Sequence, residues 1–189
     1  MTNQEMNEKI NQIITDFLFP LSEHENSKEE LAALSLLLRG FVTCNNDSIE
    51  KRPFLLTGIN PSFGSHNGKW FFPRGYAEFT FRGAISDSKP QDYWGKKREQ
   101  FCDRKQSGDR EQSGDNLCKT MAYLDLFPIR ESDQILFEQV FNNPKLTKLR
   151  ADLLSITQDA IEEMKPRLIV HANRASSYYW GLIDDAPWM

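Results

Sequence analysis

The feature that most constrains the fold of this chain is a short, nearly continuous apolar run, 54–59, bounded by Pro53 and Asn60. An apolar run of this length without alternation is typical of a strand that is buried on both faces, as strands of parallel sheets are. Similar runs occur at 121–129 and 168–172, and polar or turn-forming residues end each of them. The sequence therefore predicts three strands of a parallel sheet.

Two amphipathic helices are expected ahead of the first of these strands. Apolar residues at helical spacing predict the first helix between Asn7 and Leu18, with Pro20 marking its end. The second helix opens with a capping box formed by Ser27 and Glu30. Its apolar stripe consists of Leu31, Leu34, Leu38 and Phe41, and Gly40 closes it. Both helices are expected to pack on the core through their apolar faces.

A further helix is expected between the second and third strands. Its apolar residues run from Leu146 to Met164, and Pro166 closes it. A chain that alternates strands and helices in this way forms an α/β domain, which binds ligands at the carboxyl ends of its strands. The connection 62–118 is too long to lack structure of its own. Within it, the repeated Gln-Ser-Gly-Asp at 106–115 is expected to form an exposed loop.

The composition excludes several classes of protein. A chain of 189 residues, 39% of them hydrophobic, can form one domain with its own core. The three cysteines show neither disulfide-scaffold nor zinc-ligand spacing, and we expect no metal and no cofactor. A net charge of −4 gives no global attraction to a polyanion, so any contact with nucleic acid must be local. Because neither a signal peptide nor a membrane-length apolar run is found, the expected location is cytoplasmic.

The segment Gly58-Ile-Asn-Pro-Ser62 follows directly on the first predicted strand. It resembles the first motif of the uracil-DNA glycosylase superfamily and is closest to the Gly-Ile-Asn-Pro-Gly form of the mismatch-specific branch, from which it differs at Ser62. The segments Leu124–Arg130 and Lys165–Asn173 look like the second and third strands of that family. The resemblance covers roughly residues 53–183.

The resemblance implies a three-layer α/β/α fold with a parallel central sheet. With the two N-terminal helices that the apolar spacing predicts, we expect a single domain over residues 1–189. The family's second motif, which often begins His-Pro-Ser and enters the minor groove, is not found before Met189. We therefore expect the domain to be incomplete at its C-terminus. The implied function is hydrolysis of the N-glycosidic bond of a flipped, damaged or mismatched base in DNA repair. A non-catalytic protein on the same fold, which binds nucleic acid or nucleotides, is the alternative.

The resemblance implies one catalytic residue, and the position of a histidine at the end of a strand gives a second candidate. Asn60 would position the attacking water, because an amide is no strong base but can hold a water with its carbonyl oxygen. By turn chemistry alone, Asn60 followed by Pro61 is equally typical of a plain strand-to-loop turn. His171, at the end of the third predicted strand, is a candidate acid or electrostatic partner for the leaving base, and a structural histidine is the alternative.

The flipped base is expected to lie among residues of the first motif, an aromatic ring and a carboxylate. The candidates at the motif are Gly58, Ile59, Pro61, Ser62 and Phe63. Phe72, or alternatively Phe71, would stack on the base, although both rings could instead fill the core. Asp125 stands where the family often has an asparagine that reads the pyrimidine edge, but an ionised carboxylate only accepts hydrogen bonds and does not fit O4 of uracil. A solvated carboxylate, or one paired with Arg130, is the alternative.

Phosphate contacts are expected where the third strand ends and the last helix begins. The candidates are Asn173, Arg174 and Ser176. Asn173 or Ser176 would cap this helix, whose amide end favours a phosphate. The expected partner is DNA, single-stranded or mismatched, and no membrane contact is expected.

Overall fold

The computed structural model describes residues 1–21, 27–37, 40–45, 51–61, 65–66, 69–70, 76–80, 89–101, 120–173 and 176–180. Its elements, in chain order, are α1 (Asn3–Leu21), α2 (Lys28–Leu37), β1 (Phe41–Asn45), β2 (Phe54–Gly58), β3 (Ser65–His66), β4 (Lys69–Trp70), β5 (Tyr76–Thr80), α4 (Tyr93–Phe101), β6 (Met121–Asp125), α6 (Gln134–Phe141), a 3-10 helix (Pro144–Leu146), α7 (Thr147–Met164), β7 (Leu168–His171) and α8 (Ser176–Tyr179). The loop expected at 106–115 lies outside the described residues.

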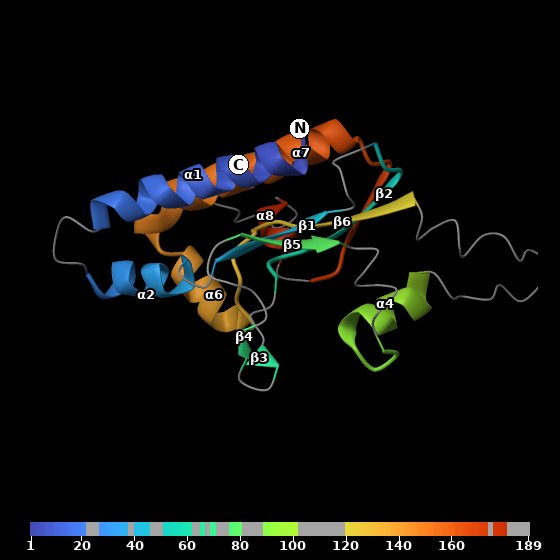
Figure 1. Cartoon of the computed structure of the whole chain (residues 1–189), viewed down its shortest axis with the longest axis horizontal. Coiled ribbons are helices and arrows are strands. Elements are labelled where there is room, and N and C mark those ends of the chain that lie inside the picture. The colour runs from blue at the N-terminus through green and yellow to red at the C-terminus, as the bar shows by residue number, and fades with distance from the viewer. Residues whose placement is uncertain are drawn as a thin grey trace, which may run out of the picture.

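A parallel sheet with the strand order β6-β2-β7 lies within a mixed α/β fold (Figure 1). Phe54 of β2 is in register with Met121 of β6 on one side and with Leu168 of β7 on the other. All five residues of β6 and the last four of β2 are buried, which confirms the prediction of strands covered on both faces. β6 and β7 are the outer strands of this sheet. β7 is only partly buried, with Leu168 49% exposed, so the prediction of a strand covered on both faces was wrong for the third strand.

Two smaller strand pairs lie beside this sheet. β1 and β5 pair in parallel, and β3 and β4 form a short antiparallel pair. Phe41 of β1 makes an isolated antiparallel bridge with Ile129, so β1 lies next to the segment that follows β6. The expected structure between residues 62 and 118 is confirmed, because this stretch contains β3, β4, β5 and α4.

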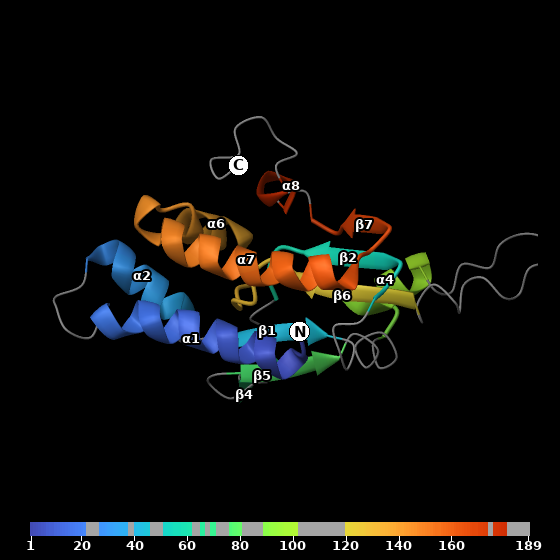
Figure 2. The same cartoon turned by 90° about the horizontal axis from the view of Figure 1, so that it is seen from above.

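Helices α1 and α7 lie side by side on the same side of the strands, with α7 over the three-stranded sheet and α1 over β1 (Figures 1 and 2). Their apolar faces form the core together with Leu55 and Leu124 of the sheet. Helix α4 lies on the other side, where Trp94 packs edge-on against Tyr123 of β6 with ring centroids 4.6 Å apart. The two faces of the sheet are therefore covered by different helices.

Helix α2 begins as the sequence predicts but buries a different face. The backbone N–H of Ser27 donates to the Glu30 carboxylate at 2.7 Å, and Glu30 N–H donates to the Ser27 hydroxyl at 3.3 Å, which confirms the capping box. The predicted apolar stripe was wrong, because Leu31 is 52% exposed and Phe41 belongs to β1. The buried residues are Ala33, Leu36 and Leu37, which lie on the face that packs against α1 and α6.

The other two predicted helices are confirmed, with differences at their ends. Helix α1 extends to Leu21, so Pro20 lies inside its last turn, where a proline removes only one helical hydrogen bond. Helix α7 ends at Met164, and Lys165 then adopts a left-handed conformation with φ 48°. Among the described residues, the helices lack the combination of length and apolar character that a bilayer span requires.

Candidate active site

The segments that leave β2 and β6 run side by side and are joined by backbone hydrogen bonds. The N–H of Leu126 donates to Gly58 O at 3.1 Å, that of Phe127 to Ile59 O at 2.9 Å, and that of Glu131 to Pro61 O at 3.0 Å. We call residues 58–61 and 125–133 the β2–β6 junction. It lies at the carboxyl ends of two adjacent parallel strands, the position at which α/β sheets bind their ligands.

The side-chain amide of Asn60 is the best-fixed polar group of the junction. Its Nδ2 faces three carbonyl oxygens, those of Glu131 at 2.7 Å, Pro61 at 3.2 Å and Ile129 at 3.3 Å. Because carbonyls can only accept, these contacts also determine which end of the amide is nitrogen and which is oxygen. Asn60 Oδ1 is buried and has no hydrogen-bond partner within the described structure. The junction therefore holds a preoriented, unused acceptor.

These contacts bear on both interpretations of Asn60. Two of its three carbonyl partners belong to the segment after β6, so the side chain ties that segment to the end of β2 rather than capping a local turn. This is a structural role, and it uses only the nitrogen end of the amide. The oxygen end has no partner in the described structure, and holding a water is the role that the resemblance implies for it.

Gly58 lies beneath a buried pair of polar side chains from β6. The Tyr123 hydroxyl donates to Asp125 Oδ1 at 2.6 Å. A Cβ atom placed on Gly58 would lie 2.2 Å from Asp125 Oδ1 and 2.4 Å from the Tyr123 hydroxyl oxygen. The glycine is thus required for close packing of the strand against this pair.

Asp125 is only 4% exposed, which excludes the alternative of a solvated carboxylate. A carboxylate buried to this extent is tolerated because it is hydrogen-bonded, here by the Tyr123 hydroxyl. Tyr123 was not among the site residues predicted from the sequence. The signal was present, because residues two apart on a strand point to the same face.

His171 lies on the opposite face of the sheet from Asp125. Gly58 is in register with Asp125, whereas the preceding residue, Thr57, is in register with His171. The imidazole Nδ1 lies 3.5 Å from the Thr57 hydroxyl and 3.4 Å from the Ser176 hydroxyl, and Trp180 packs edge-on against the ring. Burial lowers the pKa of His171 below its usual 6.5. The neutral imidazole is therefore favoured, and its catalytic role stays a prediction.

The two described candidates for phosphate binding contact each other. The Ser176 hydroxyl donates to the carbonyl of Asn173 at 2.6 Å, and Ser176 N–H lies 3.2 Å from the same oxygen. Ser176 is fully buried, so its hydroxyl is used within the chain. Helix α8 has only four residues, which leaves it a small dipole. Phosphate binding here stays a prediction.

The remaining predicted site residues divide into two groups. Ile59 is buried in the core, and Pro61 is half-buried, with its carbonyl bonded to Asn60 and Glu131. Ser62, Phe63, Phe71, Phe72 and Arg174 lie outside the described residues. The stacking ring and much of the expected base pocket are thus not placed here.

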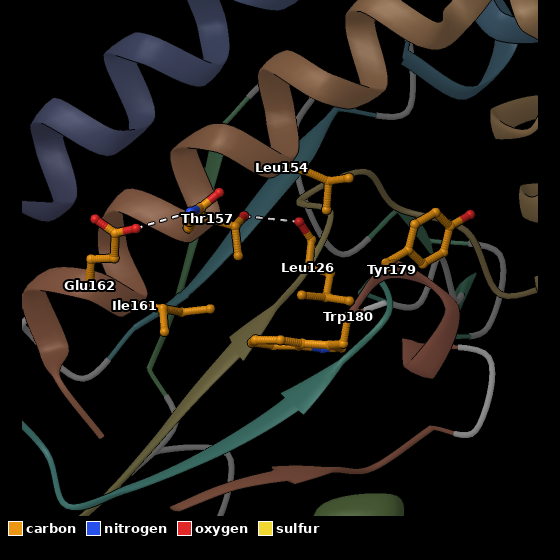
Figure 3. Close-up of a pocket in the computed structure, with 8 residues that line it drawn as sticks. Leu126, Leu154, Thr157, Ile161, Glu162, Tyr179 and Trp180 are labelled. Carbon is orange, nitrogen blue, oxygen red and sulfur yellow. Dashed lines mark hydrogen bonds between the residues drawn. The ribbon is translucent and has the colours of Figure 1, made fainter. Parts of the chain in front are cut away.

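A cavity of about 310 Å³ lies between α7 and α8 (Figure 3). Its lining is Leu126, Leu154, Thr157, Gln158, Ile161, Glu162, Tyr179 and Trp180. The Thr157 hydroxyl donates to the carbonyl of Leu126 at 2.9 Å and so ties α7 to the β2–β6 junction. Leu126 is the one junction residue that lines this cavity.

Glu131 is a second residue of the junction that was not predicted from the sequence. It is 6% exposed, and its carboxylate oxygen Oε1 accepts the backbone N–H groups of Ser132 at 2.7 Å and Asp133 at 2.9 Å. Asp133 then caps α6 by accepting the N–H of Leu136 at 3.1 Å. An acidic pair spaced to precede a helix, Glu131-Ser-Asp133, was the available signal.

Within the described ranges, no three histidine, cysteine, aspartate or glutamate side chains gather as a metal site would require. The chain matches no known family model, no curated protein and no solved structure. Its function therefore has to be inferred from the residues themselves.

Proposed function

We propose that this protein is a DNA glycosylase of the uracil-DNA glycosylase superfamily, which hydrolyses the N-glycosidic bond of a flipped base on a three-layer α/β/α domain. The observation that supports this proposal best is the buried, unpartnered Oδ1 of Asn60. Its amide is fixed by three carbonyls at the carboxyl end of the central strand, in the segment that resembles the family's first motif. The strand order β6-β2-β7, with the motif strand in the middle, is compatible with this proposal.

In the proposed reaction, Asn60 Oδ1 accepts a hydrogen bond from the attacking water. The water oxygen forms a bond to C1′ of the sugar, the bond between C1′ and the base nitrogen breaks, and the base leaves with the electron pair. The water loses a proton to solvent. Because Asn60 only orients the water, the step depends on stabilisation of the departing base and on the fixed position of the acceptor.

Asp125 and Tyr123 would set the preference for the base. Because the Tyr123 hydroxyl already donates to Asp125, the pair offers an acceptor rather than a donor to a ligand. Such a pair suits a base edge that presents N–H or amino groups better than one that presents a carbonyl. We therefore expect Asp125→Asn to shift the preference toward bases with a carbonyl at that edge.

The test measures release of free base from duplexes that carry uracil, hypoxanthine or mismatched thymine. Asn60→Ala should lower the single-turnover rate by about 10²- to 10⁴-fold, the range for loss of one positioned catalytic group. It should also reduce the free energy of unfolding by about 2 kcal/mol, because buried carbonyls lose their donor. Rates are therefore compared at a temperature at which both proteins are folded.

The matched control is Asn143→Ala, which removes an amide that accepts Lys145 N–H at 2.9 Å ahead of the 3-10 helix. It should leave base release unchanged. A folded Asn60→Ala protein that releases base at the original rate would remove Asn60 from the mechanism. Salt-dependent DNA binding without base release from any substrate would instead favour the non-catalytic binding protein.

A further inference from the structure

Glu131 connects the Asn60 amide to the start of α6. Its carbonyl oxygen makes the shortest of the three contacts with Asn60 Nδ2, at 2.7 Å, and its N–H donates to Pro61 O. Its carboxylate accepts two backbone N–H groups, those of Ser132 and Asp133. The backbone carbonyl of Glu131 thus holds the Asn60 amide, and the Glu131 side chain holds the backbone of the two residues that follow it.

We propose that Glu131 is a positioning residue for Asn60. Successive N–H groups that converge on a carboxylate form charge-assisted hydrogen bonds and fix the local backbone. Fixing residues 131–133 fixes the direction of the Glu131 carbonyl and with it the orientation of the Asn60 amide. The effect on catalysis rests on the proposed function, whereas the effect on the amide does not.

The proposal explains why a carboxylate is buried at this point. A buried anion is costly unless it is hydrogen-bonded, and the Glu131 carboxylate meets this condition through its own loop. A neutral, shorter residue at position 131 would leave two N–H groups without this acceptor. The loop would then be free to shift, and a catalytic group displaced by about 1 Å can lose about 10²-fold in rate.

The experiment follows hydrogen exchange of the Asn60 side-chain NH₂ by NMR in Glu131→Ala and Glu131→Gln. We expect exchange to become about 10- to 100-fold faster in Glu131→Ala, the effect of losing hydrogen bonds to a charged acceptor. Glu131→Gln keeps Oε1 as an acceptor, so its exchange should stay within about threefold of the original. If Glu131→Ala does not fold, Glu131→Asp is measured instead. Its side chain is one methylene shorter, so exchange of the Asn60 amide should be faster than in the original protein but slower than expected for Glu131→Ala.

The control is Asp133→Ala, which removes the cap of α6 but leaves the contacts of Asn60 in place. It should lower the melting temperature without changing exchange of the Asn60 amide. In the same series, Glu131→Ala should lower kcat for base release by about 10- to 100-fold with little change in KM, and Glu131→Gln should restore most of it.

The two proposals fail in different ways. A folded Glu131→Ala protein in which the Asn60 amide remains as protected as before overturns the positioning role, even if the protein is an active glycosylase. Absence of base release from the unaltered protein overturns the proposed function, and the exchange data then still decide whether Glu131 orients Asn60.

Discussion

Two regions at the carboxyl end of the parallel sheet carry candidate catalytic residues, and they are constructed differently. At the β2–β6 junction, backbone hydrogen bonds continue past the strands, and Asn60 contacts carbonyls on both segments at distances down to 2.7 Å. Where β7 ends, His171 has hydroxyl neighbours at 3.4 and 3.5 Å, close to the limit for a hydrogen bond. Hydrogen bonds therefore hold Asn60 at the junction more firmly than they hold His171 at the end of β7.

This difference indicates which of the two regions can hold a reacting group in a fixed position. A reacting group has to be held in position by its surroundings, and the junction provides this through buried polar groups that are bonded on several sides. The β7 edge, with Leu168 half-exposed, offers fewer constraints on His171. If stability follows the same difference, substitutions at the junction should cost more free energy of unfolding than substitutions at the β7 edge.

The largest expected effect comes from adding one methyl group to the junction. Gly58→Ala would place a Cβ atom 2.2 Å from Asp125 Oδ1 and force the Tyr123–Asp125 pair to move. Overpacking combined with a broken buried hydrogen bond should cost about 3 kcal/mol. Val170→Ala, on the half-buried β7 edge, should cost about 1 kcal/mol in the same urea titration. Equal losses of unfolding free energy in the two variants would contradict the difference between the junction and the β7 edge.

A smaller effect is expected where α7 is tied to the junction. Thr157→Val keeps the shape of the side chain but removes the hydroxyl that donates to Leu126 O, so the free energy of unfolding should fall by about 1 kcal/mol. Thr147→Val is the matched control, because its hydroxyl bonds the Pro144 carbonyl at an exposed helix start. Denaturant melts of both variants should show a clear loss only for the buried threonine.

The smallest effect is expected at the β7 edge and depends on pH. Because burial lowers the pKa of His171 in the folded protein, folding favours its neutral form. This contribution to stability is fully present above the ordinary pKa of 6.5 and is lost as the pH falls through the lower folded value. Melting temperatures of the original protein and His171→Gln should therefore converge on acidification. A constant difference across that range would show that the charge of His171 does not matter.

Much of the fold could be predicted because its signals are local. The apolar runs at 54–59 and 168–172 and the helix from Leu146 to Met164 have the length and spacing that their elements require. Helix α6 was missed although Asp133 precedes buried Phe137 and Phe141, a spacing that predicts a capped amphipathic helix. The parallel pairing of β1 with β5 could not be predicted, because it depends on which short strands meet in space.

The site was predictable in part for the same reason. The sequence indicated Asn60 as the important residue of its turn, since strand, glycine, amide and proline follow one another. Its partners, the carbonyls of Ile129 and Glu131, come from a segment that only folding brings close. The opposite orientations of Asp125 and His171 also depend on strand register, which composition and spacing do not determine.

The central position of β2 has a consequence for how the protein is made. β2 is the first strand of its sheet to be synthesised, yet both neighbours come later, β6 at residue 121 and β7 at residue 168. At about 5–20 residues per second, the ribosome leaves this apolar strand without a partner for several seconds. During that interval its unpaired edges are open to other nascent chains, so chaperone capture during synthesis should favour the yield of folded protein.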